Sequence, residues 1–101
     1  MKAPRSIACK LPAGMTEIED NAFEGVPVTP VEFPESCTFV YNYAFKDCAS
    51  LRQIRVLNPM TMFASLAFEG CSGVYVFAPE DSFARYLCNG ASGFIFVADI
   101  N

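Results

Sequence analysis

The cysteines are the side chains of this sequence that could carry the widest range of chemistry. A cysteine thiolate can attack a substrate, bind a metal ion or form a disulfide. Nucleophilic attack usually needs a neighbouring base, most often histidine, and the 101 residues include no histidine. The cysteines are odd in number and form no Cys-x-x-Cys pair, which disfavours a zinc site and a complete disulfide framework; they are Cys9, Cys37, Cys48, Cys71 and Cys88. We therefore interpret them as small buried side chains, except Cys88, which we expect to be partly exposed.

Two acidic clusters could bind a cation or the end of a helix. Glu17, Glu19 and Asp20 lack the ligand spacing of a calcium loop, so we interpret them as a solvated face. The Glu-Asp-Ser run at residues 80–82 suits the N-terminal cap of a helix, because acids and serine satisfy free helix amides. The sequence has no phosphate-binding glycine loop and no Gly-x-Ser-x-Gly motif. We predict no catalytic residue, no cofactor and no metal, and hence no enzyme.

The overall composition restricts the partners. The chain has the length of one domain, and 52% of its residues are hydrophobic. Eleven acidic and seven basic residues give a formal net charge of −4 without a basic cluster, so we expect no nucleic-acid partner. No apolar run approaches the roughly 20 residues that span a bilayer, so we expect no membrane insertion. Residues 1–7 do not resemble a signal peptide, which leaves a cytoplasmic protein and a chain that begins after a removed segment as alternatives.

A repeat organises most of the chain. The pair Ala-Phe occurs three times, with its phenylalanines at Phe23, Phe45 and Phe68, 22 and 23 residues apart. A threonine stands seven residues before each phenylalanine, an apolar residue five before it, and a valine or cysteine three after it. Such agreement predicts stacked coils with shared apolar columns, in which the threonine hydroxyls bond to backbone at a turn. Cys48 and Cys71 fall at one repeat position, so an inter-coil disulfide is an alternative to two free core thiols.

Short alternating apolar segments precede each unit and follow the last one. They cover residues 9–11, 31–33, 54–56 and 74–76. The alternation predicts strands whose outer residues point inward and whose middle residue points outward. Ile18 and Ala22 are four residues apart, which is the spacing of one helical turn. We therefore expect one strand and one irregular or helical turn in each coil.

The repeat resembles the BspA-like leucine-rich repeat, a resemblance carried by the pattern Leu11-Pro12-x-x-Met15-Thr16-x-Ile18-x-x-x-Ala22-Phe23. The second unit agrees best, through Phe33-Pro34, Thr38, Val40, Ala44-Phe45, Cys48, Leu51, Ile54 and Val56. The first unit is one residue short at residues 26–30, where we expect a bulge or a loop-like crossover. Residues 76–87 are similar to the ending of such arrays, a strand and a short helix, which Gly90 would stop before a final strand at 94–97.

The resemblance implies the fold class and its division. It predicts an α/β repeat solenoid, a right-handed leucine-rich-repeat-like coil stack with a short parallel sheet, short helical turns and a C-terminal helix-strand cap. Residues 1–101 would form one domain, with repeats at about 11–32, 33–55 and 56–77 and the cap at 78–101.

Two sets of residues are candidates for binding. Lys10, Glu32, Arg55 and Tyr75 are the outward residues of successive predicted strands, so in a parallel stack they line up on one surface. The alternative is that the three charged residues only pair across the sheet. Tyr41 and Tyr43 form the second set, because Val40 and Ala44 take the inward positions around them. Their alternative is packing over a neighbouring coil.

The resemblance also implies a function: a non-catalytic module for protein interaction or adhesion, at the cell surface or outside the cell. The alternative is a structural terminal cap or assembly element without a ligand of its own. No closing element precedes the strand at residues 7–11, and an uncapped coil leaves backbone groups exposed. We therefore expect that further repeats precede this piece in the parent protein, or that two copies self-associate at that edge.

Overall fold

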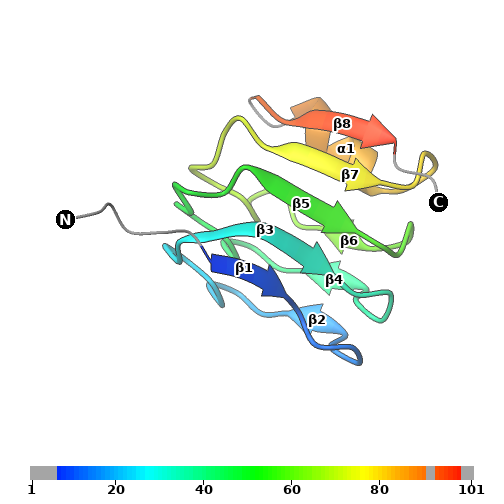
Figure 1. Ribbon diagram of the computed structural model, residues 1–101, viewed down its shortest axis with the longest axis horizontal. Coiled ribbons are helices and arrows are strands. Elements are labelled where there is room, and N and C mark those ends of the chain that lie inside the picture. The colour runs from blue at the N-terminus through cyan, green and yellow to red at the C-terminus, as the bar shows by residue number, and fades with distance from the viewer. Residues whose placement is uncertain (1–6, 91–92, 99–101) are drawn as a thin grey trace.

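Two parallel sheets stacked against each other form the body of the protein (Figure 1). The computed structural model describes residues 7–90 and 93–98. A five-stranded sheet has the order β1 (Ile7–Lys10), β3 (Val28–Phe33), β5 (Gln53–Val56), β7 (Tyr75–Ala78) and β8 (Ile95–Ala98). A three-stranded sheet contains β2 (Glu17–Ile18), β4 (Phe39–Val40) and β6 (Met62–Phe63), and the helix α1 spans Ala84–Gly90. The predicted repeat solenoid is confirmed, with little helix.

The register of the five-stranded sheet places equivalent residues of successive coils side by side. Val31 pairs with Ile54, Ile54 with Val76, and Val76 with Phe96. Val31, Ile54 and Val76 are fully buried. Their neighbours along β5 and β7, Gln53, Arg55 and Tyr75, face outward. Because parallel strands repeat one inward column, each coil contributes the same kind of side chain to a continuous core.

The interval predicted as an irregular or helical turn is not helical: it contains a two-residue strand and a tight turn. In the first turn, the amides of Ala22 and Glu24 donate within the coil, whereas those of Asn21, Phe23 and Gly25 donate to carbonyls of the second coil. A helix directs its amides along its own axis and could not bond to the adjacent coil in this way. Successive amides therefore point alternately into the coil and toward the next coil. This backbone path has a positive φ at Asn21 and Gly25, of 60° and 74°. The hydrogen bonds between coils therefore decide the local conformation.

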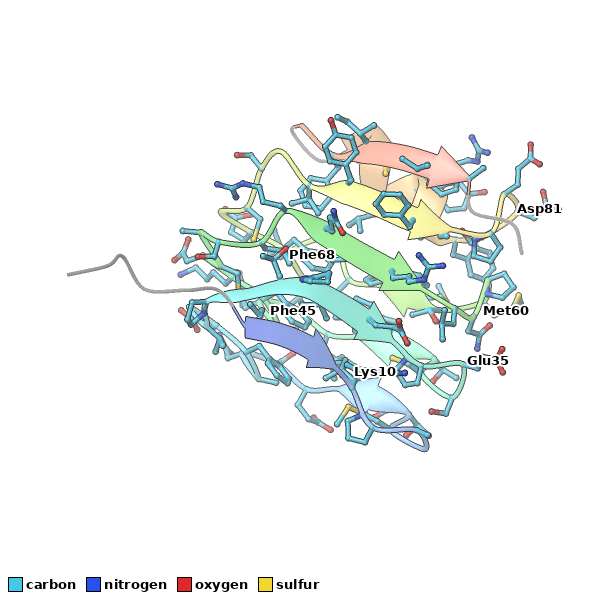
Figure 2. All side chains as sticks on the ribbon, in the orientation of Figure 1. Lys10, Glu35, Phe45, Met60, Phe68 and Asp81 are labelled. Atoms are coloured by element: carbon cyan, nitrogen blue, oxygen red, sulfur yellow. The ribbon has the colours of Figure 1, made fainter. Side chains whose placement is uncertain are left out.

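The repeated phenylalanines stack through the core. The Phe23 and Phe45 rings lie 5.1 Å apart and the Phe45 and Phe68 rings 5.4 Å apart, with interplanar angles of 12° and 15°. Phe33 approaches Phe45 edge-on at 5.6 Å. Figure 2 shows Phe45 and Phe68 one above the other in adjacent coils. Such stacked and edge-on pairs contribute beyond the apolar area that they bury.

The threonines have the structural role expected of them. The hydroxyl of Thr38 donates to the carbonyl of Thr16 at 3.2 Å, and that of Thr61 donates to the carbonyl of Cys37 at 2.7 Å. Thr61 is fully buried, whereas Thr38 is exposed. Each bond joins one coil to the preceding one, so the threonine column reinforces the stack.

The first coil contains the expected bulge. Ile7 pairs with Val28 and Cys9 with Val31, so β3 has one residue more than β1 between these two rungs. The hydroxyl of Thr29, within the bulged part of β3, accepts hydrogen bonds from the amides of Arg52 and Gln53 at 3.0 and 3.2 Å. The irregular segment is thereby tied to the next coil.

The C-terminal end closes as predicted in outline. The helix α1 ends at Gly90, and β8 adds to β7 as the last parallel strand. In Figure 1, α1 lies behind the five-stranded sheet, and it packs against β6, β7 and β8. The predicted cap by Ser82 is wrong, because its hydroxyl is buried without a hydrogen-bond partner among the described residues. The helix is fixed by packing instead: the Arg85 guanidinium lies 4.6 Å from the centre of the Phe96 ring.

Candidate interaction surface

The outer face of the five-stranded sheet begins with a column of charges. Lys10, Glu32 and Arg55 occupy directly paired positions on β1, β3 and β5. The Lys10 Nζ lies 3.9 Å from the Glu32 Oε2, and the Lys10 side chain is 82% exposed. An ion pair this open to solvent contributes at most about 1 kcal/mol to stability. The column is therefore a patterned, solvated surface more than a stabilising network.

Tyr75 lies on the same outer face as this column, but it is not the residue paired with Arg55. Arg55 pairs with Phe77, while Tyr75 pairs with Gln53 on one side and Ile95 on the other. The sequence offered Val74 and Val76 as equal partners for Ile54, and the structure selects Val76. A shift of two residues keeps every side chain on the same face of a strand. Tyr75 thus stays on the outer face, two positions before the expected rung.

The far half of this face is apolar. Tyr75 and Ile95 are each 46% exposed, and Phe77 and Val97 beside them are half-buried. Large exposed apolar side chains that gather on one face mark interaction surfaces more often than isolated ones do. Phe77, Ile95 and Val97 were missed as site residues, because the strands YVFA and IFVA are apolar on both faces and show no alternation that would assign a side chain to the outer face. We call the charged column and these four residues together the sheet face.

The aromatics of the second coil belong to another part of the molecule. Tyr41 and Tyr43 follow β4, and both are half-buried. The ring of Tyr41 lies 4.7 Å from that of Phe39, and the Lys46 Nζ lies 5.9 Å above the Tyr43 ring. The negative charge of Glu17 is the main cause that raises the pKa of the Tyr41 hydroxyl. Tyr41 thus contacts Phe39 in its own coil and Glu17 in the first coil, both on the three-stranded sheet, so we do not include the two tyrosines in the sheet face.

Four of the five cysteines are free thiols in the core and the cap. Cys37, Cys48, Cys71 and Cys88 are unpaired, and Cys88 is half-buried as expected. The thiols of Cys48 and Cys71 donate to the carbonyls of Phe23 and Phe45, each at 3.2 Å. Burial is the main cause that raises the pKa of all four thiols, which favours the unreactive neutral form. The side chain of Cys9 lies outside the described residues.

Two further searches of the described residues bear on function. Within residues 7–90 and 93–98, no three histidine, cysteine or acidic side chains gather closely enough to hold a metal ion. In the same part of the chain, no helix is both long and apolar enough to cross a membrane.

The stacked parallel strands, one coil per 22 or 23 residues, and the phenylalanine column define a repeat protein with a solenoid fold. A family model described as "BspA type Leucine rich repeat region (6 copies)" matches residues 5–86. The chain belongs to the BspA-type leucine-rich repeat family. Neither the comparison with curated proteins nor that with solved structures gives a match.

Proposed function

We propose that the chain is a non-catalytic protein-interaction module that binds its partner with the sheet face. Repeat proteins use the surface of stacked coils for binding, because equivalent side chains of successive coils form one continuous strip. The observation that carries the proposal is the division of this strip. Lys10, Glu32 and Arg55 form its charged half, and four residues centred on Tyr75 and Ile95 form its apolar half.

This division suits recognition of a folded protein. The apolar half can be desolvated at the centre of an interface, while the charged half fixes the orientation of the partner at its rim. Members of this family are typically surface-associated, so we propose a partner met at the cell surface or outside the cell, and adhesion as the biological role. A large partner protein would also contact Tyr41 and Tyr43.

A terminal cap or assembly element is the second candidate. It is supported by the closure of the C-terminal end by α1 and β8, while β1 stands at the other edge of the sheet. On this proposal, the β1 edge and the first coil stack onto further repeats or onto a second copy. Sedimentation across a range of concentrations tests it, since a monomer whose residues 7–11 show protected amides contradicts self-association.

The binding proposal is tested with a double variant, Arg55→Glu with Tyr75→Ala, probed against a panel of purified extracellular proteins by surface plasmon resonance. A charge reversal opposite Glu32 costs roughly 0.2–1 kcal/mol, so the variant should remain folded, as circular dichroism would verify. We expect loss of any binding that the native chain shows.

The matched control carries Arg52→Glu with Met60→Ala, which changes an arginine and a large exposed apolar residue outside the sheet face. This control should bind like the native chain. Equal binding by the native chain and the Arg55/Tyr75 variant would exclude the sheet face as the site.

A further inference from the structure

A cleft of about 460 Å³ lies between the third-coil turn and the helix α1. Its apolar wall is made of Phe63, Phe83, Tyr86 and Leu87, and its floor is formed by the third-coil residues Ala64, Ser65, Phe68, Glu69, Gly70 and Cys71. This volume falls within the roughly 300–1,000 Å³ typical of ligand sites. We call it the end cleft. It shares no residue with the sheet face, so the inference drawn from it does not rest on the proposed function.

The end cleft occupies the position where a fourth turn would continue the stack. In the second coil, the Phe45 amide donates to the Ala67 carbonyl at 2.9 Å and the Asp47 amide to the Glu69 carbonyl at 2.8 Å. Phe68 and Gly70 take the same two positions in the third coil and line the cleft. Their amides have no hydrogen-bond partner within the part of the chain that the structure describes. Backbone amides of this kind need an acceptor, and two at ladder spacing suit the carbonyls of another polypeptide.

The charges around the cleft favour a basic occupant. Glu69 is exposed on its floor, and the hollow beside it, which shares Phe83 and Tyr86 with the cleft, is lined by two acids and one base, Glu80, Asp81 and Arg85. The acids outnumber the base, so the charge around the cleft is negative on balance. Glu24, Lys46 and Glu69 occupy one repeat position in successive coils, and the Lys46 Nζ lies 3.7 Å from the Glu24 Oε2. The next residue in this column would face Glu69, so a lysine or arginine complements it.

A second copy of the chain suits the cleft less well. Its first turn could offer the carbonyls of Ala22 and Glu24 to the free amides. However, that turn also carries the acidic side chains of Glu19, Asp20 and Glu24, which would meet the acids around the cleft. Like charges brought together at an interface disfavour binding.

We propose that the end cleft binds a short peptide segment of a partner protein, in which a small residue and an aromatic residue are followed by a basic one. The segment continues the ladder by presenting two backbone carbonyls to the amides of Phe68 and Gly70. Its aromatic side chain packs against Phe83 and Tyr86, and its basic side chain faces Glu69. The interaction is a form of backbone addition, with affinity from main-chain hydrogen bonds and selectivity from the side chains.

The probe is a capped synthetic peptide with the sequence of residues 41–47 (Tyr-Asn-Tyr-Ala-Phe-Lys-Asp), labelled for fluorescence anisotropy. A matched peptide replaces its lysine by glutamate. We expect the lysine peptide to bind about ten-fold more tightly at low salt, and the difference to shrink as salt screens the charges. In ¹⁵N-resolved NMR spectra, the Phe68 and Gly70 amide protons should move downfield on binding, because they gain acceptors.

Two variants with matched controls locate the site. Glu69→Lys should weaken binding of the lysine peptide about five-fold or more, whereas Glu24→Lys, the same change at the same repeat position of the first coil, should leave it unchanged. Tyr86→Ala should also weaken it, and Tyr75→Ala on the sheet face should not. Equal affinity for both peptides, unmoved amides at Phe68 and Gly70, or shifts that depend on chain concentration alone would overturn the proposal.

Discussion

The second coil and the C-terminal cap close the same core by different means. In the second coil, Phe45 is stacked between Phe23 and Phe68, and the turn amides of Tyr43, Phe45 and Asp47 donate to the third coil. In the cap, Phe94 covers Phe68 at 5.8 Å with an interplanar angle of 59°, and a helix replaces the turn. The turn of the second coil is thus fixed by backbone hydrogen bonds to the next coil, whereas the helix that replaces it in the cap is fixed by side-chain packing.

The largest expected effect separates these two modes of closure. Phe45→Ala removes a ring that three other phenylalanines contact, so it should lower the free energy of unfolding by about 3–5 kcal/mol. Phe94→Ala removes a ring with one aromatic partner at the end of the stack, and we expect roughly 2 kcal/mol. Urea unfolding of both variants measures the difference. Equal losses would contradict the distinction between coil and cap.

The backbone at the junction between the second and third coils gives the next effect. Gly70 has a φ of 86°, and an added Cβ would overlap the Asp47 carboxylate and approach the Asp47 amide nitrogen at 3.3 Å. Gly70→Ala should therefore cost about 2 kcal/mol. Gly25 holds the equivalent position in the first coil with a φ of 74° and open space around it, so Gly25→Ala should cost about 1 kcal/mol. Thermal melts of both variants test whether close packing of coils adds to backbone strain.

The threonine column gives a smaller effect. Thr61→Val removes a buried 2.7 Å hydrogen bond to the Cys37 carbonyl and should cost about 1–2 kcal/mol. Thr38→Val removes an exposed 3.2 Å bond whose acceptor can bind water, so about 0.5 kcal/mol is expected. Chemical denaturation of both variants would show whether burial sets the value of this repeated contact; a larger loss for Thr38→Val would show that it does not.

The thiols give the smallest effect, which appears only at alkaline pH. Burial raises the pKa of Cys48 in the coil and of Cys88 in the cap, so the unfolded chain loses these protons first. Their contribution to stability is fully present below the ordinary thiol pKa of about 8.5 and is lost as pH rises through the raised folded values. Unfolding free energies should therefore decline from about pH 8.5 upward.

Alkylation followed by mass spectrometry should label half-buried Cys88 before Cys48, which is 1% exposed.

The repeat columns could be predicted from the sequence because the same residue types recur at several positions of each repeat. The phenylalanine stack, the inward pairing of Val31 with Ile54 and the bulge of the first coil all follow from the spacing in the sequence. The three-stranded sheet was not predictable in the same way. Ile18 and Ala22 suit a helical turn, and a strand of two residues has no alternation that could argue against it.

Neither the register of β7 nor the end cleft could be predicted from the local sequence pattern. Val74 and Val76 are both apolar and two residues apart, so alternation alone could not choose between them. The end cleft exists because α1 does not supply the carbonyls that a fourth turn would supply. Charge and hydropathy at residues 80–87 gave no sign of this.

The bulge between β1 and β3 has a consequence for how such an array tolerates changes in length. Val31 follows Phe23 by eight positions and Ile54 follows Phe45 by nine, yet the two residues pair directly in the sheet. The irregular segment that leads back to the five-stranded sheet therefore takes up a difference of one residue in coil length. The strand register of the following coils is unchanged. Repeats that differ by one residue in length can thus stack in one array, while the threonine and phenylalanine columns keep their alignment.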